Sequence, residues 1–405
     1  MIITEFPLLL FGAVVLIGFA GNLLFKYTKI PEALFLIIAG LVMGPVLGII
    51  DTTSAVALMP TIVALMLIVV MLDNGISFDL FKVMRSLPAT LAFSLGVMTL
   101  TIVALTLLFS LLGLPLITAA IVALILAGTT TDVVTALASK LSIKHETRQL
   151  MVFESIINDL QIVPFFLLLH IAGNTGRAAD VVLFTLLGIP LAIIVGAVIA
   201  IGWVFAIGRY LGKHPLNYAA TIGILFVLYQ SIQMLGGNGA VAVLAFSFVL
   251  GNAIGLFDRW HIRNTLRRKL TPRVMKDFRQ IEVDISFFVR TIFFVFLGAI
   301  FSFRALRMDV FFLVLITIAA ILISRFVSSY FLARRVHRYH DAAGPLTWIM
   351  PRGYVAAVLA FAAVGSGIIT NGILDMILLT IYATTLISIA YAVYHERKRK
   401  LPAPK

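Results

Sequence analysis

The 405-residue sequence has no cysteine and few charged residues. Without cysteine the chain cannot contain a disulfide framework, a thiolate metal site or a cysteine nucleophile. Only 12% of the residues are charged and 61% are hydrophobic, which is far from the composition of a soluble globular domain. The shortage of charge and the excess of apolar residues argue against an ordinary soluble protein and indicate a chain whose solvent is largely lipid.

Long apolar runs recur along the whole sequence and leave little room for a soluble domain. A helix needs roughly 20 apolar residues to cross ~30 Å of hydrocarbon. The first run lacks a basic leading segment and a small-residue cleavage site, so we interpret it as a retained span rather than a signal peptide. We therefore predict an all-α integral membrane protein, with a single transmembrane domain over residues 1–405. By length and hydropathy the expected spans, about thirteen in all, lie near 7–25, 31–49, 55–73, 88–112, 116–138, 150–170, 181–207, 217–235, 239–257, 284–302, 309–332, 345–367 and 372–394.

The positive charge of the chain lies in short loops. Most of the 31 Lys and Arg residues fall in alternate loops and in the C-terminal tail, whereas the opposite loops hold only Arg177, Arg304 and Arg307. Cytoplasmic loops carry the excess of Lys and Arg. We therefore predict a multi-pass protein of the cell membrane, with its N-terminus outside and its C-terminus in the cytoplasm, and no nucleic-acid partner. We interpret the basic connection 258–283 as a further cytoplasmic loop whose positive charge holds it on that side of the membrane. Contact of this loop with anionic lipid headgroups is the alternative.

Seven ionisable side chains remain inside the predicted spans. Each costs roughly 2.5–3.5 kcal/mol at the centre of a bilayer unless it pairs, takes up a proton or lines water. We expect them to face the interior of the helix bundle, and we expect Arg290 to snorkel or to pair with Asp284 near the cytoplasmic end of its span. The seven are Asp73, Asp132, Glu154, Asp159, Arg290, Arg325 and Arg352.

The densest group of polar residues is the segment Phe153–Asp159. In a helix, Glu154 and Asn158 stack on one stripe, and Ser155 and Asp159 stack on the neighbouring stripe. Hard cations such as sodium prefer carboxylate and hydroxyl oxygens, which these two stripes supply. An interhelical hydrogen-bond cluster is the alternative, but such clusters normally use neutral side chains. The segment therefore indicates a cation site.

Two predicted spans are interrupted at mid-depth. The fifth carries Ala127–Thr135, where a glycine and four threonines surround Asp132, and the twelfth carries Met350–Tyr354, where a proline and a glycine flank an arginine. Non-helical backbone in a membrane is tolerated only where protein or a wet cavity satisfies it. The two spans take equivalent places in two groups of three with opposite orientation, which is typical of inverted-repeat transporters. A packed threonine helix is the alternative for the fifth span.

At these motifs the sequence resembles the NhaP-type sodium/proton antiporters of the monovalent cation:proton antiporter superfamily. The segment Phe153–Asp159 is similar to that family's F-E-S-L-x-N-D, Thr131-Asp132 to its T-D-P, and Arg352-Gly353 to the R-G of its second broken helix. Arg325 lies where family members carry a basic residue, and Asp73-Asn74-Gly75 lies where they usually carry E-G-G.

The sequence departs from the family pattern in three features. Two of them bear on ion preference and one bears on regulation. Val133 replaces the usual proline, and Asp73 is shorter than the usual glutamate. The sequence also ends without a large cytoplasmic regulatory domain, so we expect little soluble regulation.

The resemblance implies a site for a transported cation. Asp159 would alternate between cation and proton, and Asp73 would be a weaker candidate ligand. The ion- and proton-binding residues would be Asp159, Asp132, Ser155, Thr131 and Asp73, with Na+ held at Asp159, Ser155 and the backbone of Thr131.

The resemblance also implies supporting residues. Glu154 would pair with Arg325, and Arg352 would stabilise the crossing of the broken helices near Asp132. Family members with Asn-Asp at the position of Asn158 are generally electroneutral, which implies one proton for each cation.

These features together predict an inverted-repeat antiporter fold with two broken crossing helices. The moving core would be the spans at 88–170 and 309–394, and the spans at 7–73 and 181–302 would form a scaffold, which the resemblance implies is also a homodimer interface. The expected activity is exchange of Na+ for H+, with no cofactor and no enzymatic reaction, since no histidine has the H-E-x-x-H spacing and no serine the hydrolase elbow. Exchange of potassium for protons is the alternative, followed by a cation channel and by a non-transporting scaffold or sensor.

Overall fold

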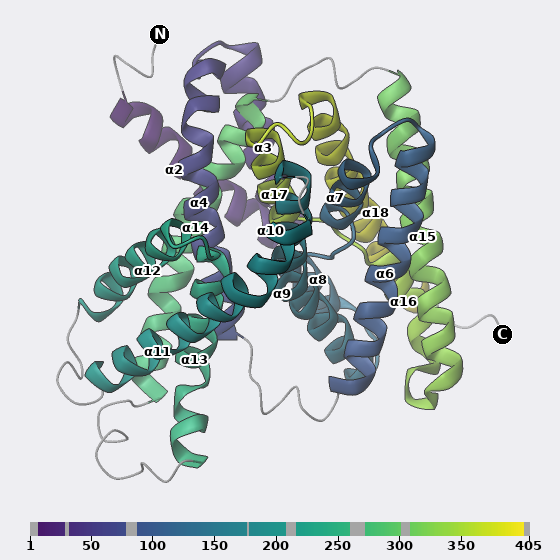
Figure 1. The fold of residues 1–405 in the computed structure, drawn as a ribbon. Helices are drawn as coiled ribbons and strands as arrows, with labels where there is room; N and C mark the ends of the chain where they lie inside the picture. The colour runs from purple at the N-terminus through teal and green to yellow at the C-terminus, as the bar shows by residue number, and fades with distance from the viewer. Residues whose placement is uncertain are drawn as a thin grey trace. The chain divides into compact units, whose positions relative to one another are not determined.

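The computed structural model describes residues 7–28, 32–77, 87–175, 178–207, 216–259, 272–300 and 308–400. Every regular element in these ranges is helical (Figure 1), which confirms the predicted all-α fold class. The elements are α2 (Pro7–Thr28), α3 (Glu32–Leu41), η1 (Val42–Val46), α4 (Thr52–Ser77), α6 (Leu87–Leu111), α7 (Leu116–Ile125), α8 (Thr131–Lys140), α9 (His145–Thr175), α10 (Ala178–Leu183), η2 (Phe184–Gly188), α11 (Ile189–Ala206), α12 (Asn217–Met234), α13 (Gly239–Arg259), α14 (Pro272–Ile300), α15 (Met308–Arg335), η5 (His337–Ala342), α16 (Ala343–Trp348), α17 (Tyr354–Gly365) and α18 (Asn371–Lys400).

Seven of the described helices are long and apolar enough to cross a membrane, and shorter apolar helices accompany them. Two of the shorter apolar helices, Leu116–Ile125 and Tyr354–Gly365, fall within the spans predicted at 116–138 and 345–367. The seven candidates are Ala55–Ile76, Thr90–Leu111, His145–Gly173, Ala179–Ala206, Val283–Ile300, Met308–Arg335 and Asn371–Arg397. Thirteen crossings remain a prediction.

Both predicted interruptions are present. In the span expected at 116–138, α7 ends at Ile125 and α8 begins at Thr131, after the segment that contains Gly128. In the span expected at 345–367, α16 ends at Trp348 and α17 begins at Tyr354. Pro351 has no N–H to continue the helix and restricts the residue before it to extended backbone. Local chemistry therefore explains both breaks.

One predicted connection is shorter than expected. The sequence suggested a loop over 258–283, but α14 already begins at Pro272, so the second half of that stretch is helical. The first turns of this helix carry basic residues. A prediction from hydropathy therefore detects only the apolar part of the helix that follows them.

The chain forms two compact units. One comprises Met1–Pro60, Ser86–Asn174 and Phe294–Lys405, and the other comprises Thr61–Arg85 and Thr175–Phe293. In the first unit α6 packs along α15, and α17 packs against both α7 and α18 (Figure 1). In the second unit α13 packs against α11 and α12. Both interruptions lie in the first unit.

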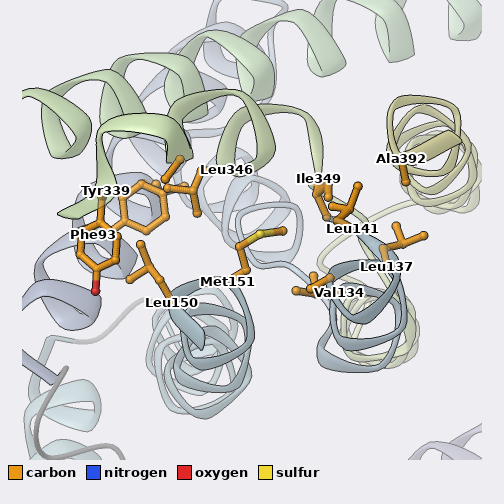
Figure 2. Packing of buried hydrophobic residues seen from close by; sticks show 13 residues of the cluster. Phe93, Val134, Leu137, Leu141, Leu150, Met151, Tyr339, Leu346, Ile349 and Ala392 are labelled. Atoms are coloured by element: carbon orange, nitrogen blue, oxygen red, sulfur yellow. The ribbon is translucent and has the colours of Figure 1, made fainter. Parts of the chain in front are cut away.

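A buried apolar cluster joins the helices around the interruptions on one side of the first unit. Figure 2 shows Val134 and Leu137 of α8 together with Leu150 and Met151 of α9 and with Leu346 of α16. Lipid is as apolar as these side chains, so the gain comes mainly from close van der Waals packing rather than from removal of water. The cluster ties one half of each broken helix to α9.

Candidate functional site

The first interruption places a hydroxyl beside a buried carboxylate. Thr131 is the first residue of α8, where the N–H groups of the first turn have no partner within the helix and the helix dipole is positive. Its Oγ1 donates a hydrogen bond of 2.8 Å to Oδ2 of Asp159 on α9. Asp159 is only 1% exposed. The structure therefore brings together two of the predicted ion-binding residues at the start of a half-helix.

Ser155 and Asp132 lie close in sequence to these two residues. Ser155 is buried on α9, one turn before Asp159, and its hydroxyl donates to the carbonyl oxygen of Val152 at 2.8 Å. That bond uses the serine proton and leaves oxygen lone pairs as potential ligands. Asp132 is the second residue of α8, and its side chain lies outside the described part of the structure.

A second carboxylate is held by an arginine. Glu154 and Arg325 of α15 form a salt bridge of 3.0 Å between Oε1 and Nη1, and each side chain is only 1% exposed. Arg325 also donates to the carbonyl oxygens of Leu346 at 2.9 Å and Ile349 at 3.3 Å. The arginine therefore binds α9 to the end of α16, just before the second interruption, and the structure contains the pairing that the resemblance implied.

Asn158 connects this pair to a helix that the sequence did not single out. Its amide donates to Glu154 Oε1 at 2.7 Å and to Thr129 Oγ1 at 3.1 Å, and its Oδ1 accepts a hydrogen bond of 2.7 Å from Ser94 of α6. The Ser94 hydroxyl also lies 3.4 Å from Gln161 Oε1. Sequence reasoning missed Ser94, because a lone serine in an apolar span gives no signal of its partner.

Arg352 occupies the crossing of the two interruptions. Its Nε donates to the carbonyl oxygen of Leu126, at the end of α7, at 2.7 Å. The carbonyl groups at a helix C-terminus have no partner within the helix and carry partial negative charge. The guanidinium therefore neutralises the end of one half-helix at the crossing. Its Nη2 is buried and has no hydrogen-bond partner among the described residues.

The backbone groups released by the second interruption are satisfied by α18 and by the first interruption. Ser388 accepts from the Met350 N–H at 3.0 Å, and Thr384 accepts from the Arg352 N–H at 3.2 Å. The Thr130 N–H donates to the carbonyl oxygen of Pro351 at 2.9 Å, which joins the two unwound segments directly. Hydroxyl groups thus replace the helical hydrogen bonds that water cannot supply in a membrane.

Gly353 permits this close approach, and its replacement tests the crossing. A Cβ at Gly353 would collide with the Thr130 side chain. We expect Gly353→Ala to lower stability by about 1–3 kcal/mol, because the crossing segments must separate. Thermal unfolding in detergent measures this change. The matched control is Gly365→Ala, because a Cβ at Gly365 meets no atom within 4 Å. Equal melting of the two variants would contradict the role given to Gly353.

The remaining intramembrane charges form a pair in the second unit. Arg290 of α14 lies 2.8 Å from Asp73 of α4, between Nη2 and Oδ2. The prediction that Arg290 pairs with Asp284 was therefore wrong. Residues six positions apart face different sides of a helix, since neighbours on a helix surface are three or four apart. Asp73 was also a predicted ion ligand, and in this structure its carboxylate contacts an arginine.

The potential ligands at this site are carboxylate and hydroxyl oxygen atoms. Within the part of the chain that the structure describes, no group of three or more His, Cys, Asp or Glu side chains could hold a metal ion. Carboxylate and hydroxyl oxygens suit a weakly held hard cation.

Comparison with known proteins gives three findings. A family described as "Sodium/hydrogen exchanger, transmembrane" matches residues 12–393. The chain is 32% identical over 231 residues to the Na(+)/H(+) antiporter ApNhaP of Aphanothece halophytica, a match that covers 55% of this chain and 40% of that protein. The chain therefore spans less than half the length of that relative.

Solved structures of the sodium proton antiporter MjNhaP1 from Methanocaldococcus jannaschii have a similar fold. The structure at pH 8 superposes with a TM-score of 0.75 at 20% identity and covers 96% of this chain and 95% of that one. A second structure gives a TM-score of 0.72 at 20% identity, with 98% of both chains covered. The chain thus shares its all-helical fold with a known antiporter.

Proposed function

Because the chain belongs to the sodium/hydrogen exchanger family, we propose that it exchanges Na+ for H+ across the cell membrane as a secondary active transporter. The observation that carries this proposal is the hydrogen bond of 2.8 Å between Thr131 and Asp159. It places a buried, ionisable carboxylate beside the positive end of a half-helix. A carboxylate there can bind either a proton or a cation in a space closed to bulk solvent.

Competition at one carboxylate couples the two ions. Ionised Asp159 binds Na+, together with oxygen atoms of Ser155 and Thr131, and Asp132 completes the ion shell. Protonated Asp159 binds no cation. Because only these two loaded forms cross the membrane, a gradient of either ion drives the other in the opposite direction. Asp73 would contribute to cation binding only in a state in which it leaves Arg290.

Neighbouring charges support an electroneutral exchange. Glu154 is paired with Arg325, so its negative charge is already balanced. Asn158, next to the carrier, is a neutral amide whose hydrogen bonds go to Ser94, Glu154 and Thr129. Only Asp159 then changes its protonation state during a cycle, which gives one proton for each cation.

The proposed movement uses the two groups of spans. The spans at 88–170 and 309–394 would move as a core against those at 7–73 and 181–302, which would also form a homodimer interface. The excess of basic residues in alternate loops supports a cytoplasmic C-terminus. Such a transporter would control the internal pH and sodium content of the cell.

Flux measurements in proteoliposomes test the proposed exchange. Sodium or potassium is added in turn while an internal dye reports pH and a potassium-independent dye reports voltage. We expect sodium-dependent proton flux without a voltage. Potassium-dependent flux would assign the alternative ion, since oxygen ligands alone do not distinguish the two. Cation current without proton exchange would identify a channel, and silence with both ions would overturn the transport proposal.

Replacing Thr131 tests the ligand set. Thr131→Val keeps the shape of the side chain but removes the donor to Asp159. A hydrogen bond to a charged group contributes about 1.5–3 kcal/mol, so we expect the apparent KM for sodium to rise roughly tenfold or more. The control is Thr135→Val, since Thr135 is exposed one turn further along α8. An unchanged KM in Thr131→Val would remove the Thr131 hydroxyl from the ligand set.

A further inference from the structure

A cavity of about 260 Å³ lies between the end of α8 and the last turns of α18. Its walls combine apolar and basic side chains. Leu137, Leu141 and Ala392 belong to the buried cluster in Figure 2, and Ile389 and Val393 extend the apolar surface along α18. The charged residues at the cavity are Lys140, Glu396 and Arg397. None of these residues belongs to the proposed cation site.

The residues of α18 form a stripe that ends in a positive charge. Leu386, Ile389, Val393 and Arg397 follow one another at spacings of three or four, so they lie on one face of the helix. Val393 is 39% exposed and Leu386 is 48% exposed. At 1.5 Å per residue, this stripe is roughly 16 Å long, about half of the ~30 Å hydrocarbon core. The stripe therefore has the length of one leaflet.

The end of α8 repeats this arrangement. Leu137 precedes Lys140 by three residues, so an apolar side chain is again followed by an ammonium group near the helix end. The negative end of the α8 dipole does not oppose an anion here, because Arg148 donates to the carbonyl oxygens of Ala138 at 2.9 Å and Leu141 at 3.0 Å. Each of the two helices thus contributes apolar side chains and one cation near its C-terminal end to the cavity lining.

The acidic residue of the cavity is already engaged. The carboxylate of Glu396 accepts hydrogen bonds from the Ser142 N–H at 2.7 Å and from the Ser142 hydroxyl at 3.3 Å. It holds the segment after α8 against α18 and leaves the lining with an excess of one positive charge. A ligand with one negative charge and apolar chains complements this lining.

We infer that the cavity binds one anionic phospholipid, with its phosphate at Lys140 and Arg397 and an acyl chain along Ile389 and Val393. The bound lipid bridges α8 and α18. Since α8 begins at Thr131, the lipid would stabilise the half-helix that contacts Asp159. The inference concerns lipid binding and does not depend on the transported ion.

The test measures binding of short-chain phosphatidylglycerol to the purified full chain by native mass spectrometry. A basic residue near an anionic lipid surface contributes about 1 kcal/mol. Loss of both cations in Lys140→Gln/Arg397→Gln should therefore weaken binding roughly thirtyfold. The single variant Arg397→Gln, at an exposed helix end, should weaken binding about fivefold and serves if the double variant does not fold. The control Arg334→Gln/Arg335→Gln removes two exposed charges from the end of α15 and should leave the affinity unchanged.

Three results would overturn the inference. The first is equal affinity of wild type and the Arg397→Gln variant for phosphatidylglycerol. The second is equally tight binding of phosphatidylcholine with the same chains, which would show that charge does not select the ligand. The third is binding of inorganic phosphate as tight as that of the lipid, which would assign the two cations to a free phosphate.

Discussion

Replacing Asp159 with asparagine is expected to reduce sodium-dependent proton flux to the level of protein-free liposomes while the protein remains folded. Asparagine keeps the size of the side chain and can still accept the hydrogen bond of 2.8 Å from Thr131. It cannot release a proton, and it offers a cation no negative charge. Because the proposed coupling needs both properties in one group, neither loaded state of the cycle would form.

The control for this variant is the same substitution at an exposed aspartate. Asp284 lies on the surface of α14, so Asp284→Asn removes one carboxylate without touching the site. Its flux should match the wild type. Thermal unfolding of both variants in detergent separates loss of function from loss of fold. Substantial sodium-dependent flux in Asp159→Asn would show that another group carries the ions.

Breaking the pair between Glu154 and Arg325 is expected to have the largest effect on stability. Both side chains are 1% exposed, and Glu154→Gln would leave the guanidinium without its carboxylate. Removing one partner of a buried ion pair typically costs about 3–5 kcal/mol, because the other charge stays buried and uncompensated. Arg325→Met should cost at least as much, since it also removes donors to the carbonyl oxygens of Leu346 and Ile349.

A double variant and a control at an exposed ion pair test whether the loss of stability comes from an uncompensated buried charge. In Glu154→Gln/Arg325→Met neither charge remains, so the loss should be smaller than the sum of the two single losses. The control pair is Lys144 and Asp341, which are 2.7 Å apart but 57% and 63% exposed. Neutralising that pair should change stability by no more than about 1 kcal/mol. The explanation fails if the single variants of the buried pair melt like the wild type.

The two substitutions separate two kinds of carboxylate on one helix. Glu154 and Asp159 are both buried, but an arginine balances Glu154, whereas Thr131 contacts Asp159 through a neutral hydroxyl. We expect substitution of Glu154 to lower mainly the stability of the protein and substitution of Asp159 to lower mainly transport. This division of roles is what an exchanger needs, because only one group should change its charge during the cycle.

Much of this protein could be read from local sequence. Apolar runs predicted the membrane class, because helices are the spanning structures that satisfy every backbone group internally. Gly128 with its neighbouring threonines, and Pro351 with Gly353, predicted the two interruptions, because backbone geometry depends mainly on nearby residues. Charged residues inside the predicted spans indicated the site, because a charged side chain is unfavourable in lipid unless it is paired, protonated or in contact with water.

Partners far apart in the chain were decided by tertiary structure. Arg290 contacts Asp73 rather than Asp284, and Ser94 reaches Asn158 from a helix that carries no other signal. The Arg352 side chain ends on the carbonyl oxygen of one particular residue, Leu126. Spans that are apolar on nearly every side do not show which face meets which neighbour. The sequence by itself therefore determined the membrane class, the breaks and the charges, and only the packing of the helices decided which of these groups meet.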